Sequence, residues 1–165
     1  MSKNYILDKH QANSKLQRLA LEVAENLEGE NTPLIIIGIR NSGMVIAEKI
    51  GSFLKDYLPM PTQIISMSFD KHLPREIELG DMVDFNDKNI LIVDDVTNSG
   101  KTLLYALKPL LNQHPKRIQT LVLVERMHKL FPVKPDYVGL SVATTLQDMI
   151  VVEVEHNEVK GAYIN

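Results

Sequence analysis

The stretch that most constrains the fold of this chain runs from residue 89 to residue 107. An apolar run, Asn89-Ile-Leu-Ile-Val93, ends in two adjacent acids, Asp94 and Asp95. A short hydroxyl-rich loop with one glycine follows, and then an apolar-periodic segment over residues 103–107. This order predicts a buried strand, a loop of the size that binds a phosphate, and the N-terminus of a helix.

The two halves of this stretch suit different parts of one ligand. Backbone N–H groups at the helix start favour an anion, and the hydroxyls of Thr97, Ser99 and Thr102 can add hydrogen bonds to it. The carboxylates of Asp94 and Asp95 cannot serve the same anion, and they suit hydroxyls or a hydrated cation instead. A sugar phosphate carries both kinds of group.

Two simpler interpretations compete with this one. The Ser99-Gly-Lys-Thr102 segment could end a nucleoside-triphosphate P-loop, but that motif needs a glycine five residues before Gly100, where Asp95 stands. The acid pair could also be a solvated turn after a strand. The acid pair is followed directly by a hydroxyl-rich loop and a helix start, and this combination favours a ligand site over a solvated turn.

A second strand, loop and helix occur earlier in the chain. Residues 34–39 are apolar on both faces, which is typical of a central strand in a parallel sheet covered by helices. The loop Gly38-Ile-Arg40-Asn-Ser-Gly43 follows, and helical spacing resumes at Ala47. Arg40 offers forked donors for a second anion, although a plain turn with a solvated arginine is the alternative. Both loops are expected at the carboxyl edge of one sheet.

The rest of the chain continues this alternation of helices and strands. Apolar periodicity predicts a helix over 11–27 and strands over 62–69, 117–124, 136–139 and 149–155, with an edge strand over 161–164. The helix that starts near Thr102 is expected to kink or end at Pro109. Residues 125–129 are expected to form a charged loop at the ligand edge. The polar stretch 70–88 has the length of a lid, where Lys71, His72 and Arg75 could meet a ligand or remain solvated.

Composition limits the class of protein. The 165 residues suffice for one domain with a substantial core, and 44% hydrophobic and 24% charged residues are ordinary for a soluble globular protein. A net charge of −3 disfavours broad nucleic-acid binding, but a local basic patch stays open. The absence of cysteine excludes disulfides and thiol chemistry. Without a signal-peptide core or an apolar run that spans a bilayer, we expect a cytoplasmic protein with no membrane partner.

The two loops together resemble the type I phosphoribosyltransferases. That superfamily has an apolar strand, two acids, and a loop that usually ends in Thr-Gly, where this chain has Ser99 before Gly100. Within it, the chain is most similar to the bifunctional pyrimidine operon regulators and uracil phosphoribosyltransferases. The segments that carry this likeness are Ile6-Leu-Asp8, Leu123-Val-Glu-Arg-Met-His128, Pro132, and Asp136-Tyr-Val-Gly139. The resemblance therefore extends from residue 6 to near the C-terminus.

The resemblance implies an α/β fold with a doubly wound, mainly parallel five-stranded sheet, helices on both faces and a small hood region. It implies a single phosphoribosyltransferase domain over 1–165, with a flexible lid at about 70–88 and base-side hood elements at about 125–165. It also implies a homodimer or a higher oligomer.

Placed on these residues, the resemblance implies a binding site for 5-phosphoribosyl-1-diphosphate. Asp94 and Asp95 would be the catalytic residues, and their carboxylates would contact the ribose hydroxyls. The implied substrate-binding residues are Arg40, Asn41, Ser42 and Gly43 at the diphosphate, Thr97, Asn98, Ser99, Gly100, Lys101 and Thr102 at the 5-phosphate, and, in addition, Val96 and Arg126. The segment from Glu125 to Tyr137, which contains Arg126, would lie beside the base. The family often has a cis peptide near Arg40. Mg²⁺ would arrive on the diphosphate and meet the protein mainly through water, near the two acids.

Three functions are compatible with this pattern. The favoured one is an enzyme that transfers phosphoribosyl to a nucleobase, with uracil as the best guess. Asn98 stands where purine-salvage relatives have an aspartate, which disfavours hypoxanthine and guanine. A regulator that binds RNA is less favoured, and it would need a basic face built from Lys9, His10, Lys15, Arg18, Lys129 and Lys134. The third is a donor-binding domain without catalysis, favoured by Asp70 and Met127, which depart from the family pattern in the lid and the base loop.

Overall fold

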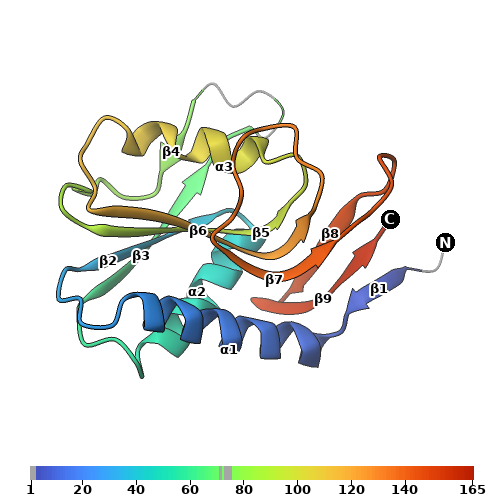
Figure 1. Ribbon diagram of the computed structural model, residues 1–165, viewed down its shortest axis with the longest axis horizontal. Helices are drawn as coiled ribbons and strands as arrows, with labels where there is room; N and C mark the ends of the chain where they lie inside the picture. The colour runs from blue at the N-terminus through green and yellow to red at the C-terminus, as the bar shows by residue number, and fades with distance from the viewer. Residues whose placement is uncertain (1–2, 71, 73–75) are drawn as a thin grey trace.

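The computed structural model describes residues 3–70, 72 and 76–165, so the predicted roles of Lys71 and Arg75 lie outside the described residues. The main sheet has the order β4-β3-β2-β5-β6-β7 (Figure 1). Its strands are β2 (Leu34–Ile39), β3 (Thr62–Ser68), β4 (Glu78–Leu79), β5 (Asn89–Thr97), β6 (Arg117–Arg126) and β7 (Tyr137–Val142). The five strands β3, β2, β5, β6 and β7 pair in parallel, and β4 pairs antiparallel with β3 at the edge of the sheet.

Helices cover both faces of this sheet, which confirms the predicted doubly wound fold, although the sheet has six strands and not the predicted five, because β4 adds to its edge. They are α1 (Lys9–Asn26), α2 (Ser42–Leu54) and α3 (Lys101–Ala106), with α1 and α2 on one face and α3 on the other (Figure 1). The strand β2 explains the arrangement. Its alternate residues Leu34 and Ile36 pack into the core beside α1 and α2, whereas Ile35 and Ile37 pack with Leu103 of α3. A strand between two helical layers must be apolar throughout.

The ends of the helices follow local sequence signals. α1 begins at Lys9, two residues earlier than predicted, because Asp8 caps it: the Asp8 carboxylate accepts a hydrogen bond from Gln11 N at 2.7 Å, and the Gln11 side chain accepts one from Asp8 N at 2.9 Å. α3 ends at Ala106, and the 3₁₀ turn Lys108–Leu110 that follows contains Pro109. This confirms the predicted break.

A second sheet is built from both ends of the chain. Its strands are β1 (Asn4–Leu7), β8 (Ile150–Glu155) and β9 (Glu158–Ile164), in the order β1-β9-β8. The prediction of an edge strand over 161–164 is wrong, because β9 is the middle strand and pairs antiparallel with both neighbours. β1 was not predicted, since four residues are too few to show a period.

The stretch 70–88 contains more structure than the long polar loop that the sequence predicts. β4 lies within it, and Phe85 is only 1% exposed in the core beside α3. The backbone N–H of Phe85 also donates to Gln113 Oε1 at 2.7 Å. The last part of this stretch is therefore anchored to the body of the protein. Among the helices that the structure describes, none has the length and apolar character to cross a bilayer.

Candidate functional site

The two adjacent acids lie in the carboxyl half of β5, just beyond Val93, which is the last residue that pairs with β2, whereas β6 continues to pair with β5 as far as Thr97. Asp94 is 1% exposed and Asp95 is 9% exposed. Each carboxylate accepts a hydrogen bond from the next backbone amide: Asp94 Oδ1 from Asp95 N at 2.9 Å, and Asp95 Oδ1 from Val96 N at 2.8 Å. Buried carboxylates held in this way are oriented by the backbone of the strand itself.

The loop at the start of α2 lies directly against these acids. A Cβ atom placed at Gly43 would be 2.8 Å from Val93 O and 3.1 Å from Asp94 Oδ1. Only a residue without a side chain permits this approach. The expectation that the two loops meet at one edge of the sheet is therefore confirmed, and the contact is between backbone atoms and the first acid.

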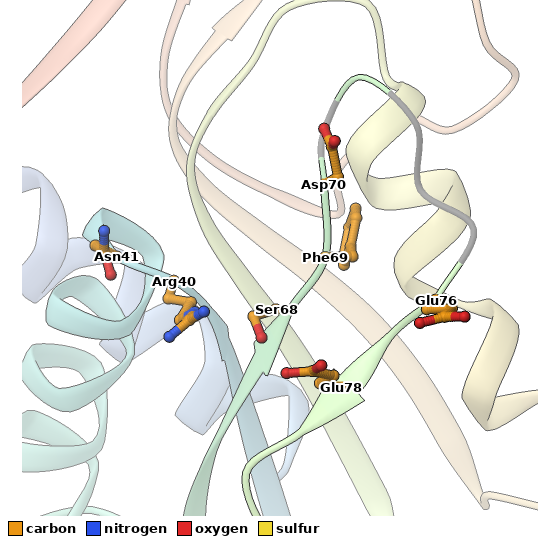
Figure 2. Close-up of a pocket in the computed structure, with 7 residues that line it drawn as sticks. All are labelled: Arg40, Asn41, Ser68, Phe69, Asp70, Glu76 and Glu78. Carbon is orange, nitrogen blue, oxygen red and sulfur yellow. The ribbon is translucent and has the colours of Figure 1, made fainter.

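The Arg40–Asn41 peptide bond is cis, as the resemblance implied. Both residues line a cavity of about 670 Å³, together with Ser68, Phe69, Asp70, Glu76 and Glu78. Figure 2 shows Arg40 and Asn41 on one side of this cavity, with Ser68 between Arg40 and Glu78 in this view. The cavity combines one guanidinium with three carboxylates, and such a lining suits an anion that arrives with a bound cation.

Sequence reasoning missed two acids of this cavity, Glu76 and Glu78. They lie in a polar stretch without periodicity, so no local pattern marks them. Glu78 reaches the cavity because β4 pairs with β3, with Ser68 opposite Glu78 in the ladder. The position of Glu78 at the cavity therefore depends on strand pairing in the folded protein and not on a local sequence pattern.

The hydroxyl-rich loop is shorter than predicted, because the strand before it ends later and the helix after it begins earlier. β5 continues to Thr97, because β6 pairs with Val96 and Thr97. The turn then reaches Gly100, whose φ of +87° is a conformation that favours glycine, and α3 begins at the next residue. Ser99 Oγ accepts from Lys101 N at 3.3 Å. Lys101 Nζ, in turn, donates to His72 O at 3.1 Å.

Residues 125 and 126 belong to β6, so the prediction that the charged loop begins at residue 125 is wrong. The ladder between β6 and β7 extends to the Arg126–Val142 pair, which keeps both residues in the sheet. Arg126 Nη2 donates to Thr145 O at 2.5 Å. Its Nε and the Oδ1 atom of Asn98 are buried, and neither has a hydrogen-bond partner among the described residues.

The six basic residues of the predicted RNA-binding face are partly neutralised. Lys9 pairs with Glu158, and Lys129 pairs with Glu125. Arg18 pairs with Glu22 at 2.6 Å. The guanidinium of Arg18 also donates to Val138 O and Gly139 O in β7. Three of the six basic residues are thus engaged within the protein, and Arg18 binds backbone carbonyl groups of β7, the edge strand of the main sheet.

Metal ligation by protein side chains alone has little support in the described part of the chain. There, no group of three His, Asp or Glu side chains has the arrangement of a metal site. The carboxylates that could contact a hydrated cation are Asp94 and Asp95 at the strand end and Asp70, Glu76 and Glu78 in the cavity.

The pattern of the whole chain matches known proteins. Residues 2–158 match the phosphoribosyl transferase domain. The chain is 31% identical to the bifunctional protein PyrR of Macrococcus caseolyticus over 94% of both chains. It is 30% identical to that of Limosilactobacillus fermentum, over 91% of this chain and 90% of the relative.

Solved structures show the same fold at lower identity. The hypoxanthine phosphoribosyltransferase of Trypanosoma cruzi superposes with a TM-score of 0.83 at 15% identity, over 99% of this chain and 96% of that one. The hypoxanthine-guanine phosphoribosyltransferase of Bacillus anthracis gives a TM-score of 0.73 at 21% identity, over 92% and 87%. These identities support the fold alone. With the domain match and the PyrR relatives, the predicted family is confirmed: the chain belongs to the phosphoribosyl transferase domain family.

Proposed function

We propose that this protein binds 5-phosphoribosyl-1-diphosphate and transfers its phosphoribosyl group to a nucleobase, with uracil as the acceptor. The observation that carries this proposal is the contact between Gly43 and Asp94. It brings a loop suited to a diphosphate next to two carboxylates suited to ribose hydroxyls. The membership of the chain in the phosphoribosyl transferase domain family supports the same reaction.

The proposed roles follow the position of each group along the sheet edge. Asp94 and Asp95 bind the ribose hydroxyls and stabilise the positive charge that develops on the ribose as the diphosphate leaves. The diphosphate is held by Arg40, Asn41, Ser42 and Gly43, and the 5-phosphate by Val96, Thr97, Asn98, Ser99, Gly100, Lys101 and Thr102. Arg126 lies on the acceptor side. These residues orient the donor and stabilise the charge that develops during the reaction, and none of them acts as a nucleophile toward the sugar.

The cavity lining fits a Mg²⁺ ion that is carried by the diphosphate, as phosphoribosyltransferases generally use it. When bound, the ion neutralises charge on the leaving group. Asp70, Glu76 and Glu78 would repel a bare diphosphate, but they can hold water molecules of a hydrated cation. Arg40 supplies the direct donor to the diphosphate oxygens.

Two observations support uracil over a purine. The relatives at about 30% identity are PyrR proteins, which the sequence resemblance associates with uracil. Asn98 is an amide and cannot take up a proton at neutral pH, so it cannot act as a base toward a purine ring. The purine-handling neighbours among solved structures are less than 25% identical and carry no weight for the acceptor.

The test is calorimetric binding of 5-phosphoribosyl-1-diphosphate with Mg²⁺, followed by turnover with a panel of uracil, orotate, hypoxanthine, guanine, adenine and xanthine. We expect donor binding that Asp94→Asn with Asp95→Asn abolishes, and turnover with uracil. Asp56→Asn, a change at an exposed carboxylate, serves as the control. Donor affinity that is unchanged in the double variant would exclude the proposed site. Donor binding without turnover of any base would favour a noncatalytic sensor.

A second candidate function is RNA-dependent regulation of a pyrimidine operon. The near full-length similarity to PyrR proteins, whose name includes the word bifunctional, favours it. The internal pairing of Lys9, Arg18 and Lys129 weakens it. Filter binding of a pyrimidine-operon leader transcript, with a scrambled RNA as control, distinguishes the two. Sedimentation velocity tests the homodimer or higher oligomer that the resemblance implies.

A further inference from the structure

Glu125 is a buried carboxylate that the proposed reaction does not use directly. It lies near the carboxyl end of β6 and is only 7% exposed. In the sheet it stands between Thr97, where β5 ends, and Ser141 in β7. A carboxyl group in such a place needs hydrogen-bonding or charged partners to compensate for its lost hydration.

Two side chains supply that compensation. Ser141 Oγ donates to Glu125 Oε1 at 2.7 Å, and Lys129 Nζ lies 3.4 Å from Glu125 Oε2. The same ammonium donates to Arg126 O. The side chain of Lys129 is 16% exposed. Lys129 lies three residues beyond the end of β6, and its side chain is therefore turned back onto the last residues of that strand.

This pair lies over the loop that is proposed to hold the 5-phosphate. Ser99 O accepts hydrogen bonds from Leu130 N and Phe131 N, both at 3.0 Å. A Cβ atom at Gly100 would lie 3.2 Å from Phe131 O and 3.5 Å from Lys129 Cδ. The segment after β6 and the phosphate loop are thus packed backbone to backbone, and the Glu125–Lys129 pair holds the start of that segment.

We propose that Glu125 and Lys129 are positioning residues for the acceptor. By holding the carbonyl of Arg126 and the segment 127–131 against Ser99 and Gly100, the pair places the acceptor side at a set distance from the donor. The two residues act through Arg126 and touch neither substrate. This inference rests on the proposed function, because it assigns the two sides of the site to donor and acceptor.

The main test uses Lys129→Met, which keeps an apolar stem over Gly100 and removes the ammonium. We expect the KM for uracil to rise about tenfold, while the dissociation constant of 5-phosphoribosyl-1-diphosphate changes by less than about twofold. Lys129→Arg retains the charge and should restore most of the uracil KM. Lys108→Met, at an exposed lysine of the 3₁₀ turn, should leave both constants unchanged. Glu125→Gln, which still accepts a hydrogen bond from Ser141, should behave like Lys129→Met.

A change in thermal stability alone, or equal losses for donor and acceptor, would show that the pair is merely structural and would overturn the proposal. Hydrogen exchange of the Leu130 and Phe131 amides in the ligand-free protein gives a readout that does not require activity. We expect faster exchange in Lys129→Met. If exchange is faster but the wild-type protein binds no donor, the proposed function fails while the pairing of the loops stands. Unchanged exchange overturns the positioning role whatever the activity.

Discussion

Gly43 leaves no room for a side chain beside Asp94, because a Cβ atom at Gly43 would lie 3.1 Å from Asp94 Oδ1. The first turn of α2 thereby rests on the strand that carries both acids. The absence of a side chain at Gly43 therefore sets the distance between the proposed diphosphate loop and the carboxylates that are proposed to bind the ribose. Any side chain at position 43 must push these two parts of the site apart.

We therefore expect Gly43→Ala to weaken both the fold and donor binding. Alanine favours a helix over glycine by up to about 1 kcal/mol, but a Cβ at 2.8 Å from Val93 O overpacks the core, which costs about 1–3 kcal/mol. The steric effect should win. Urea unfolding measures the first loss and calorimetry with 5-phosphoribosyl-1-diphosphate the second. Ser52→Ala, at an exposed site in the same helix, is the control, and an unimpaired Gly43→Ala protein would contradict the close contact.

Arg40→Ala should weaken binding of the diphosphate group and leave binding of the nucleoside monophosphate almost unchanged. Loss of a charge-assisted hydrogen bond costs about 1.5–3 kcal/mol, so inhibition by inorganic diphosphate should weaken at least about tenfold. Binding of uridine monophosphate, which lacks a diphosphate, should change little. Competition assays with the two ligands make the comparison. Equal losses for both would argue against a contact between Arg40 and the diphosphate.

Phe85→Ala tests whether the end of the stretch 70–88 belongs to the core. Phe85 is 1% exposed, and removing a buried aromatic ring costs about 3–5 kcal/mol. Met82→Ala is a matched control in the same stretch, because Met82 is fully exposed. Denaturant unfolding should show a large loss for the first variant and almost none for the second. Equal stability of the two would mean that residues around Phe85 leave the core.

The Glu30–Lys116 pair predicts a dependence of stability on pH. Lys116 Nζ donates to the Glu30 carboxylate at 2.8 and 3.1 Å, and this contact holds the pKa of Glu30 below its usual value. A lowered carboxyl pKa adds stability above the pKa of the unfolded chain, about 4.3, and this stability is lost as pH falls through the folded value.

Lys116→Met should consequently be less stable than the wild type at neutral pH, and the difference should disappear in acid, below the lowered pKa of Glu30. Urea unfolding over a series of pH values measures it. Lys55→Met, at an exposed lysine, provides the baseline. A difference that grows in acid would have the wrong sign and would refute the pairing.

The central strands were predictable because burial on both faces leaves a continuous apolar run. The predicted strand over 34–39 has the same bounds as β2. The acids after Val93 stood out for a related reason, since charge directly after an apolar run is unusual in a buried strand, although β5 itself continues to Thr97. These signals are local, so one sequence suffices.

The parts that were missed depend on pairing between distant segments. Glu78 enters the cavity only because β4 adds to β3. β6 runs on to Arg126 because both its neighbours continue to offer partners. The central place of β9 depends on β1 at the other end of the chain. The residue types within these segments do not indicate which strand each segment pairs with. A prediction from apolar periodicity ends a strand where its residues become polar.

The position of β5 between β2 and β6 has a thermodynamic consequence for the proposed reaction. The strand is buried along almost its whole length, and its carboxylates are tied to their own backbone. The conformational entropy of arranging Asp94 and Asp95 is therefore lost when the chain folds and not when the donor arrives. Ordering costs on binding should fall instead on segments outside the parallel strands, so substitutions there would change the entropy of donor binding more than its enthalpy.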